Sequence, residues 1–151
     1  MSAPLPYQSL ILNIMFYNIF KSIQTALKTV AGLKATQWFN MQYEATIALS
    51  PVAFVEFPDD NPTDHASKDV TRLPFKVRIH VVTKVIAGQD GQVPDIAIQQ
   101  NETLALAVKA ALKTLKPLGC TTLRFSGLKT WQRMNGFMIT FVDFTARIEE
   151  V

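Results

Sequence analysis

The side chains best suited to bind a metal are few in this chain. It contains two histidines, His65 and His80, and one cysteine, Cys120. A zinc or iron site needs several such ligands brought together at short spacing, and these three residues belong to segments of different character. We interpret His80 as a solvated or interface histidine on a polar strand face. The sequence therefore predicts no metal site at these residues.

An acidic stretch before His65 is the other candidate for metal binding. It contains three aspartates, Asp59, Asp60 and Asp64. A calcium loop of the EF-hand type requires a glycine and a terminal glutamate at fixed positions, and neither follows at the right place. We interpret residues 58–72 as a long, exposed polar loop or as the tip of a hairpin, and we expect no metal and no cofactor.

Catalytic chemistry has no recognisable frame in the sequence. There is no G-x-S-x-G, no P-loop and no G-x-G-x-x-G, which argues against a nucleophile elbow and the usual phosphate cradles. Cys120 lies in no catalytic signature and has no second cysteine to pair with, so we expect a buried, inert thiol and a reducing compartment. Glu149 and Glu150 stand at the C-terminal tip, where a walled site that shifts their pKa values is not expected. We expect the protein not to be an enzyme.

Basic residues are scattered along the chain, but one segment arranges them regularly. Fifteen Lys and Arg against twelve Asp and Glu give a formal net charge of +3, and no run of them marks a nucleic-acid footprint. Between Leu73 and Ile86, four apolar residues alternate with polar ones: Phe75, Val77, Ile79 and Val81 against Lys76, Arg78, His80 and Lys84. This period of two predicts a strand with the two sets on opposite faces.

Candidate contacts with partners lie near the end of the chain. Trp131, Arg133 and Met134 occur together in a segment that we interpret as a loop, and these residue types are enriched in interfaces. Local packing of the loop is the alternative. In the last strand, Phe137–Ile148, the apolar positions change parity, which predicts either a β-bulge or burial of both faces for part of its length. A neighbouring subunit that covers the second face would contact Phe144 and Ile148.

The remaining elements follow from periodicity and from glycine and proline. An apolar stripe predicts a helix from Met15 toward Gly32: Phe16, Phe20, Ile23, Leu27 and Val30. Further segments complete the order α-β-β-β-α-β-β: strands at 36–43, 51–57 (short and near an edge) and 73–86, a helix from Ile96 or Asn101 to Lys116, and strands at 121–127 and 137–148. The fold class is α+β, with a mainly antiparallel sheet of four to five strands and both helices on one face.

The chain is long enough for one domain. We assign residues 15–151 to it and residues 1–14 to an N-terminal extension, which Pro4 and Pro6 keep extended. The apolar stretch Leu10–Phe20 is too short to span a bilayer, and no positive charge precedes it, so we expect neither a signal peptide nor a membrane contact.

In element order the chain resembles the tail-terminator, or tail-completion, proteins of long-tailed bacteriophages. The similar phrases are the opening helix FYNIFKSIQTALKTVAGL (16–33), the strand PVAFVEF (51–57), the strand FKVRIHVVTK (75–84), the helix LALAVKAALKTL (104–115) and the closing strand FMITFVDFTARI (137–148). The resemblance covers most of the chain from Met15 onward. The extension 1–14 and the long loop 58–72 depart from it.

The resemblance implies a structural role in the virion. Members of this family form a ring, commonly a hexamer, at the head-proximal end of the tail tube, where it stops tube polymerisation and joins the head connector or neck. The expected partners are other copies of the chain, the tail-tube protein and the connector proteins, and the expected location is the tail–neck region after assembly in the host cytoplasm. Closed rings use heterologous contacts, for which the last strand and the loops 58–72 and 87–95 are candidates.

Two further interpretations stay open. The basic face with Lys76, Arg78, His80 and Lys84 either lines the lumen that DNA crosses or is an ordinary solvated sheet face. The chain is alternatively a connector adaptor, a tail-tube-like subunit, or a small α+β ligand-binding or enzymatic domain, for which a pocket with convergent polar groups is required.

Overall fold

The computed structural model describes residues 5–43, 50–58, 73–86, 88, 90–131 and 136–149, with the side chains of 5–15 and of Trp131 outside the description. The described residues form two helices and five strands: α1 (Leu5–Leu27), β1 (Ala35–Trp38), β2 (Val52–Glu56), β3 (Leu73–Lys84), α2 (Asp95–Leu112), β4 (Arg124–Trp131) and β5 (Phe137–Ile148). The predicted α+β class and element order are confirmed.

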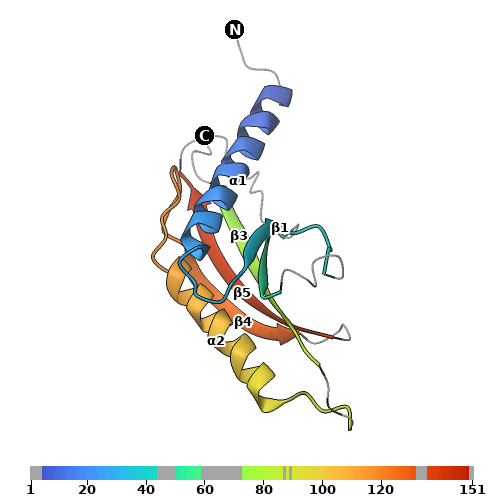
Figure 1. Ribbon diagram of the computed structural model, residues 1–151. Coiled ribbons are helices and arrows are strands. Elements are labelled where there is room, and N and C mark those ends of the chain that lie inside the picture. The colour runs from blue at the N-terminus through green and yellow to red at the C-terminus, as the bar shows by residue number, and fades with distance from the viewer. Residues whose placement is uncertain are drawn as a thin grey trace.

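The strands form one sheet in the order β1-β2-β3-β5-β4 (Figure 1). Only β1 and β2 run parallel, and the other pairs are antiparallel. The long strands β3 and β5 pair along their whole length, from Leu73 opposite Ile148 to Lys84 opposite Phe137. The strand expected at 51–57, short and near an edge, is confirmed, because β2 has five residues and lies beside the edge strand β1. The last strand, β5, lies between β3 and β4, so its backbone cannot pair with a neighbouring subunit.

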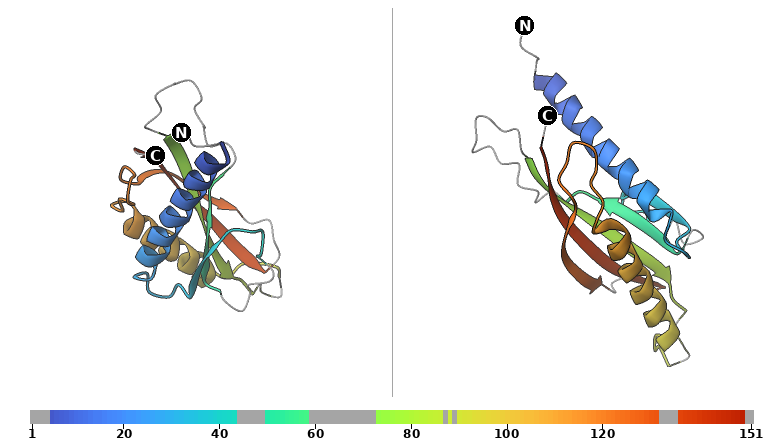
Figure 2. Two further views of the ribbon diagram at one scale, coloured as in Figure 1. Left: turned by 90° about the horizontal axis from the view of Figure 1, so that it is seen from above. Right: turned by 90° about the vertical axis from the view of Figure 1, so that its left-hand side faces the viewer.

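Both helices pack on one face of the sheet (Figure 2). Their apolar stripes meet the apolar face predicted for β3, which consists of Phe75, Val77, Ile79 and Val81. The face with Lys76, Arg78, His80 and Lys84 points away from the helices, and we call it the helix-free face. The predicted two-sided character of this strand is confirmed.

Helix α1 begins earlier than expected. It runs without interruption from Leu5 to Leu27, through the predicted boundary at residue 14. The extended conformation expected for residues 1–14 is therefore wrong for residues 5–14, and residues 1–4 lie outside the described residues. A proline in the first turn is compatible with a helix because its missing N–H would have no partner there. The stripe expected on this helix is confirmed, and Ile23 and Leu27 are almost fully buried. The chain turns after Leu27 and reaches Gly32 with φ +88°, a conformation that favours glycine.

Asn101 does not open the second helix but lies inside it and is fully buried. Its amide nitrogen donates to the carbonyl of Val81 (3.3 Å), the hydroxyl of Thr83 (3.0 Å) and the carbonyl of Met138 (3.1 Å), and its oxygen accepts from Thr140 Oγ1 (2.5 Å). A buried amide is tolerated when its groups are hydrogen-bonded. Asn101 therefore ties α2 to the two central strands.

The change of parity in β5 reflects burial on both faces. Phe137, Ile139 and Phe141 join a second core cluster on the helix-free face, whereas Val142 and Phe144 join the main core under the helices. The irregular register is in β4, where Ser126 is extra between Phe125 and Gly127. Of the two alternatives for β5, burial of both faces is the one confirmed.

Candidate functional surface

The helix-free face has two ends that differ in their coverage. At one end, the chain leaves the sheet after Trp38 and turns back, with the Gln42 side-chain amide donating to the Trp38 carbonyl (2.7 Å). This turn places Phe39 and Tyr43 over the second core cluster, against Phe54. We call this covered region the closed end.

His80 lies in the closed end and is only 3% exposed. Its ring stacks on Phe39, with ring centroids 4.1 Å apart, and meets the edge of Phe141 at 4.7 Å. Its Nδ1 is hydrogen-bonded to the Tyr43 hydroxyl and its Nε2 to Glu56 Oε1 (2.8 Å). The interpretation of His80 as a solvated or interface histidine is therefore wrong.

Burial controls the titration of this cluster. Desolvation lowers the pKa of His80 below its usual value, against the opposing effect of Glu56, which accepts a hydrogen bond from the ring and carries a negative charge. The same burial, with the nearby Glu56 charge, raises the pKa of the Tyr43 hydroxyl. Both groups are therefore neutral at pH 7.

Tyr43, His80 and Glu56 form a relay of the kind that activates nucleophiles in enzymes. Tyr43 is only 4% exposed and His80 only 3%, so a substrate has no access to the atoms that would react. The relay stabilises the packing of the turn on the sheet, and we assign no catalytic role to it.

An ion pair separates the closed end from the rest of the helix-free face. Arg78 Nε and Nη2 donate to the two carboxylate oxygens of Asp143 at 2.9 and 3.1 Å. The Arg78 guanidinium also lies 4.5 Å from the centre of the Phe141 ring. Arg78 is thus committed to Asp143 and Phe141, which sequence pattern alone did not indicate.

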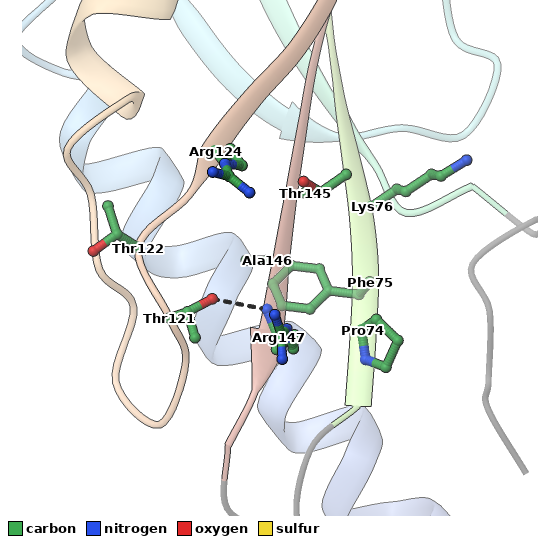
Figure 3. Close-up of a pocket in the computed structure, with 9 residues that line it drawn as sticks. All are labelled: Pro74, Phe75, Lys76, Thr121, Thr122, Arg124, Thr145, Ala146 and Arg147. Atoms are coloured by element: carbon green, nitrogen blue, oxygen red, sulfur yellow. Dashed lines mark hydrogen bonds between the residues drawn. The ribbon is translucent and has the colours of Figure 1, made fainter. Parts of the chain in front are cut away.

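The other end of the helix-free face is hollowed. A groove of about 460 Å³ lies across the ends of β3, β4 and β5 (Figure 3). Nine residues line it: Pro74, Phe75, Lys76, Thr121, Thr122, Arg124, Thr145, Ala146 and Arg147. Three of these are cations and none is a carboxylate, so we call this region the basic groove.

Register explains why the cations gather there. Lys76 of β3 and Arg124 of β4 are both paired with Thr145 of β5, from opposite sides. Arg147 follows two residues later on the same strand, so all four residues share one face. Neighbouring strands are about 4.8 Å apart and alternate residues about 6.7 Å apart, so the three cationic residues start from backbone positions around Thr145. The Lys76 side chain extends away from Thr145 (Figure 3).

The sequence singled out Lys76 but missed Arg124 and Arg147. These arginines are far from Lys76 along the chain, and only the strand order β3-β5-β4 brings them together. Both are exposed. The alternation of Thr145 and Arg147 with buried residues at the end of β5 is the sequence pattern that indicates Arg147 on the helix-free face.

The structure places the residues that were predicted to contact a partner in different environments. Phe144 and Ile148 are fully buried in the main core, so the prediction that their side chains contact a partner is wrong. Trp131 does not lie in a loop but ends β4, paired with Ile139, and its side chain is outside the described residues. Arg133 and Met134 also lie outside them, as do Asp59, Asp60, Asp64 and His65. Lys84, at the far end of β3, is exposed on the helix-free face.

Several other expectations concern single groups. Cys120 is buried, and burial raises the pKa of its thiol to about 11, which agrees with the predicted inert thiol. Among the described residues, no three His, Cys, Asp or Glu side chains are grouped so that they could hold a metal ion. In the part of the chain that the structure describes, neither helix has the length and apolar character needed to cross a membrane.

Comparisons with known proteins establish a relationship in fold. Neither the protein-family models nor the curated proteins gave a match to this sequence. Among solved structures, the fold is similar to a chain in the structure described as "Virion of native gene transfer agent (GTA) particle", with a TM-score of 0.56 and 17% sequence identity. The similarity covers 89% of this chain and 97% of the other. The chain therefore shares its fold, over almost its whole length, with a component of a virion.

Proposed function

We propose that this protein is a structural component of a virion, and that it caps the head-proximal end of a tail tube as a ring. The observation that carries the virion role is the fold similarity to a chain of a gene transfer agent virion, which extends over nearly all of both chains. The finer assignment to the tail terminus is supported by the sequence resemblance to tail-terminator proteins. Its partners would be other copies of the chain, the tail-tube protein and the connector or neck proteins.

The surface of the domain is compatible with such a ring. The sheet has two different edges, β1 and β4, at opposite sides. A ring needs two different patches that meet head to tail. Exposed apolar side chains lie near both edges, Trp38 and Met41 on the side of β1 and Leu128 on β4, and these are the surfaces that we expect a neighbouring copy to cover.

The experiment that tests this proposal is negative-stain electron microscopy of the concentrated, purified protein, alone and mixed with tail tubes. Closed rings with a central hole, and the same rings seated on tube ends, are expected. A terminator binds tube ends and stops their growth, whereas a connector adaptor binds only after the terminator and a tube-like subunit adds to the length. A compact two-fold dimer that does not bind to tail tubes would contradict the proposal.

Two variants test where the ring contacts lie. We expect Trp131→Ala and deletion of residues 1–14 each to weaken ring formation, measured by sedimentation, without loss of the folded domain. Trp131 ends the edge strand β4, and tryptophan is among the residues that contribute most to interfaces. Thr114→Ala is a suitable control, because Thr114 is exposed just after α2. Assembly of both variants at the wild-type concentration would contradict this placement.

A further inference from the structure

We propose that the basic groove binds the sugar–phosphate backbone of DNA through Arg124 and Arg147. The groove is a different site from the row of basic residues along β3, of which His80 is buried and Arg78 is paired with Asp143. The choice of DNA as the anion rests on the proposed virion role, whereas the groove itself rests on the geometry alone.

The first argument is charge. Arg124 and Arg147 are exposed, and neither has a carboxylate partner among the described residues. Arg78, on the same face, differs from these two arginines because it donates two hydrogen bonds to the Asp143 carboxylate. Arginine that is exposed and has no acidic partner is suited to bind phosphate through two parallel hydrogen bonds.

The second argument is the chemistry of the other lining groups. Phosphate contacts in protein–DNA complexes come from Arg and Lys together with Ser and Thr hydroxyls, and three threonines line the groove: Thr121, Thr122 and Thr145. The Thr121 hydroxyl oxygen accepts the backbone N–H of Arg147 (2.9 Å; Figure 3), which leaves its O–H as a donor. The groove thus presents donors of the types that phosphate oxygens accept.

The third argument is spacing. Arg124 is paired with Thr145 of β5, and Arg147 lies two residues further along β5, so the two backbones are about 8 Å apart on one face. One strand of duplex DNA presents a phosphate every 3.4 Å along the helix axis, or about two over this distance. Two separate arginines suit a repeating anion better than a single small one. We therefore assign the groove to a phosphate backbone.

The test is the binding of a fluorescein-labelled duplex of random sequence, followed by anisotropy over a series of salt concentrations. The variant Arg124→Gln/Arg147→Gln removes two charges from the groove. The matched control, Lys28→Gln/Lys113→Gln, removes two charges from exposed positions just after α1 and α2, on the helix side. Because bound cations release counterions in proportion to their number, the groove variant should lose most of the salt dependence of the wild type.

We expect the groove variant to bind DNA at least about tenfold more weakly at low salt, and the control to stay within about threefold of the wild type. Arg124→Lys/Arg147→Lys retains the charges and should restore most of the salt dependence. Thermal unfolding followed by circular dichroism verifies that each variant is folded.

Three results would overturn the inference: no binding of DNA by the wild type at low salt, equal losses in the groove and control variants, or displacement of DNA by an acidic peptide of equal charge at a lower concentration. The last would assign the groove to an acidic protein segment. Electron microscopy of the same samples separates this inference from the proposed function. Rings without DNA binding would refute only the inference, and DNA binding without rings would refute only the ring.

Discussion

The closed end and the basic groove lie on the same face of the same sheet, but they have opposite properties. At the closed end, the turn with Phe39 and Tyr43 covers the strands, and His80 is buried between aromatic rings. At the groove, Arg124 and Arg147 are exposed around a hollow. Both ends carry titratable or cationic side chains at alternate strand positions. A position on the helix-free face therefore does not determine whether the side chain is buried or exposed.

The difference comes from coverage by segments far away in the sequence. Tyr43 reaches His80 across a separation of 37 residues, and Glu56 reaches it from β2. In the described part of the chain, the groove has no such cover. A polar side chain that is covered must find partners, and it then stabilises the fold. A polar side chain that stays exposed is available to a ligand. The closed end therefore contributes to the stability of the fold, and the basic groove is the end that we propose for binding.

The largest expected effect is on stability at the closed end. Phe54 is fully buried there, in contact with Phe39 and Tyr43. Phe54→Ala removes a large side chain from a packed cluster and should lower the free energy of unfolding by about 3–5 kcal/mol. Urea denaturation followed by circular dichroism measures it. Arg147→Ala, at the groove, is the comparison and should change it by no more than about 0.5 kcal/mol. Similar losses in both variants would erase the distinction between the two ends.

The next effect concerns the buried hydrogen bonds of His80. His80→Phe keeps a ring between Phe39 and Phe141 but removes the hydrogen bonds to Tyr43 and Glu56. Taking one partner from a buried polar group costs about 1–3 kcal/mol, so we expect a loss of this size in urea denaturation.

The double variant His80→Phe/Tyr43→Phe removes both partners of one hydrogen bond and should lose less than the sum of the two single variants. Strict additivity would show that the Tyr43–His80 contact contributes nothing of its own.

How much the sequence predicts depends on whether the deciding contacts are local. The alternation in 73–86 predicts the two faces of β3, because side chains of a strand alternate whatever the rest of the chain does. The helix stripe of Phe20, Ile23 and Leu27 predicts its buried face for the same reason. The sequence does not predict the start of α1, because a proline is compatible with both an extended chain and the first helical turn, where Pro6 lies.

Non-local contacts account for the other misses. Asparagine is common at the start of a helix, which is why the sequence predicts a helix that begins at Asn101. Asn101 is buried inside the helix instead, because β3 and β5 offer hydrogen-bond acceptors and a donor to its amide. The sequence predicts a solvated His80 because His80 shares its strand face with Arg78 and Lys76 at alternate positions. The residues that bury it come from the turn at 39–43 and from β5. The basic groove was missed because its cations come from three strands. Strand order, which the sequence did not specify, creates it.

The smallest expected effect is the pH dependence of stability at the closed end. Burial lowers the folded-state pKa of His80, while Glu56 and the Asp143 charge raise it and the Arg78 charge lowers it further, with a net decrease. The unfolded chain then binds a proton near pH 6.5 that the folded chain does not, so stability is complete above that pH and falls as the pH decreases toward the folded pKa. The free energy of unfolding changes by at most about 1.4 kcal/mol per pH unit for one proton. Subtracting the urea stability of His80→Phe from that of the wild type at each pH between 5 and 8 reports on the His80–Glu56 pair, because the other carboxylates and His65 are common to both proteins. The difference should shrink as the pH falls from 6.5, and a difference that grows would mean that Glu56 holds His80 protonated in the folded protein.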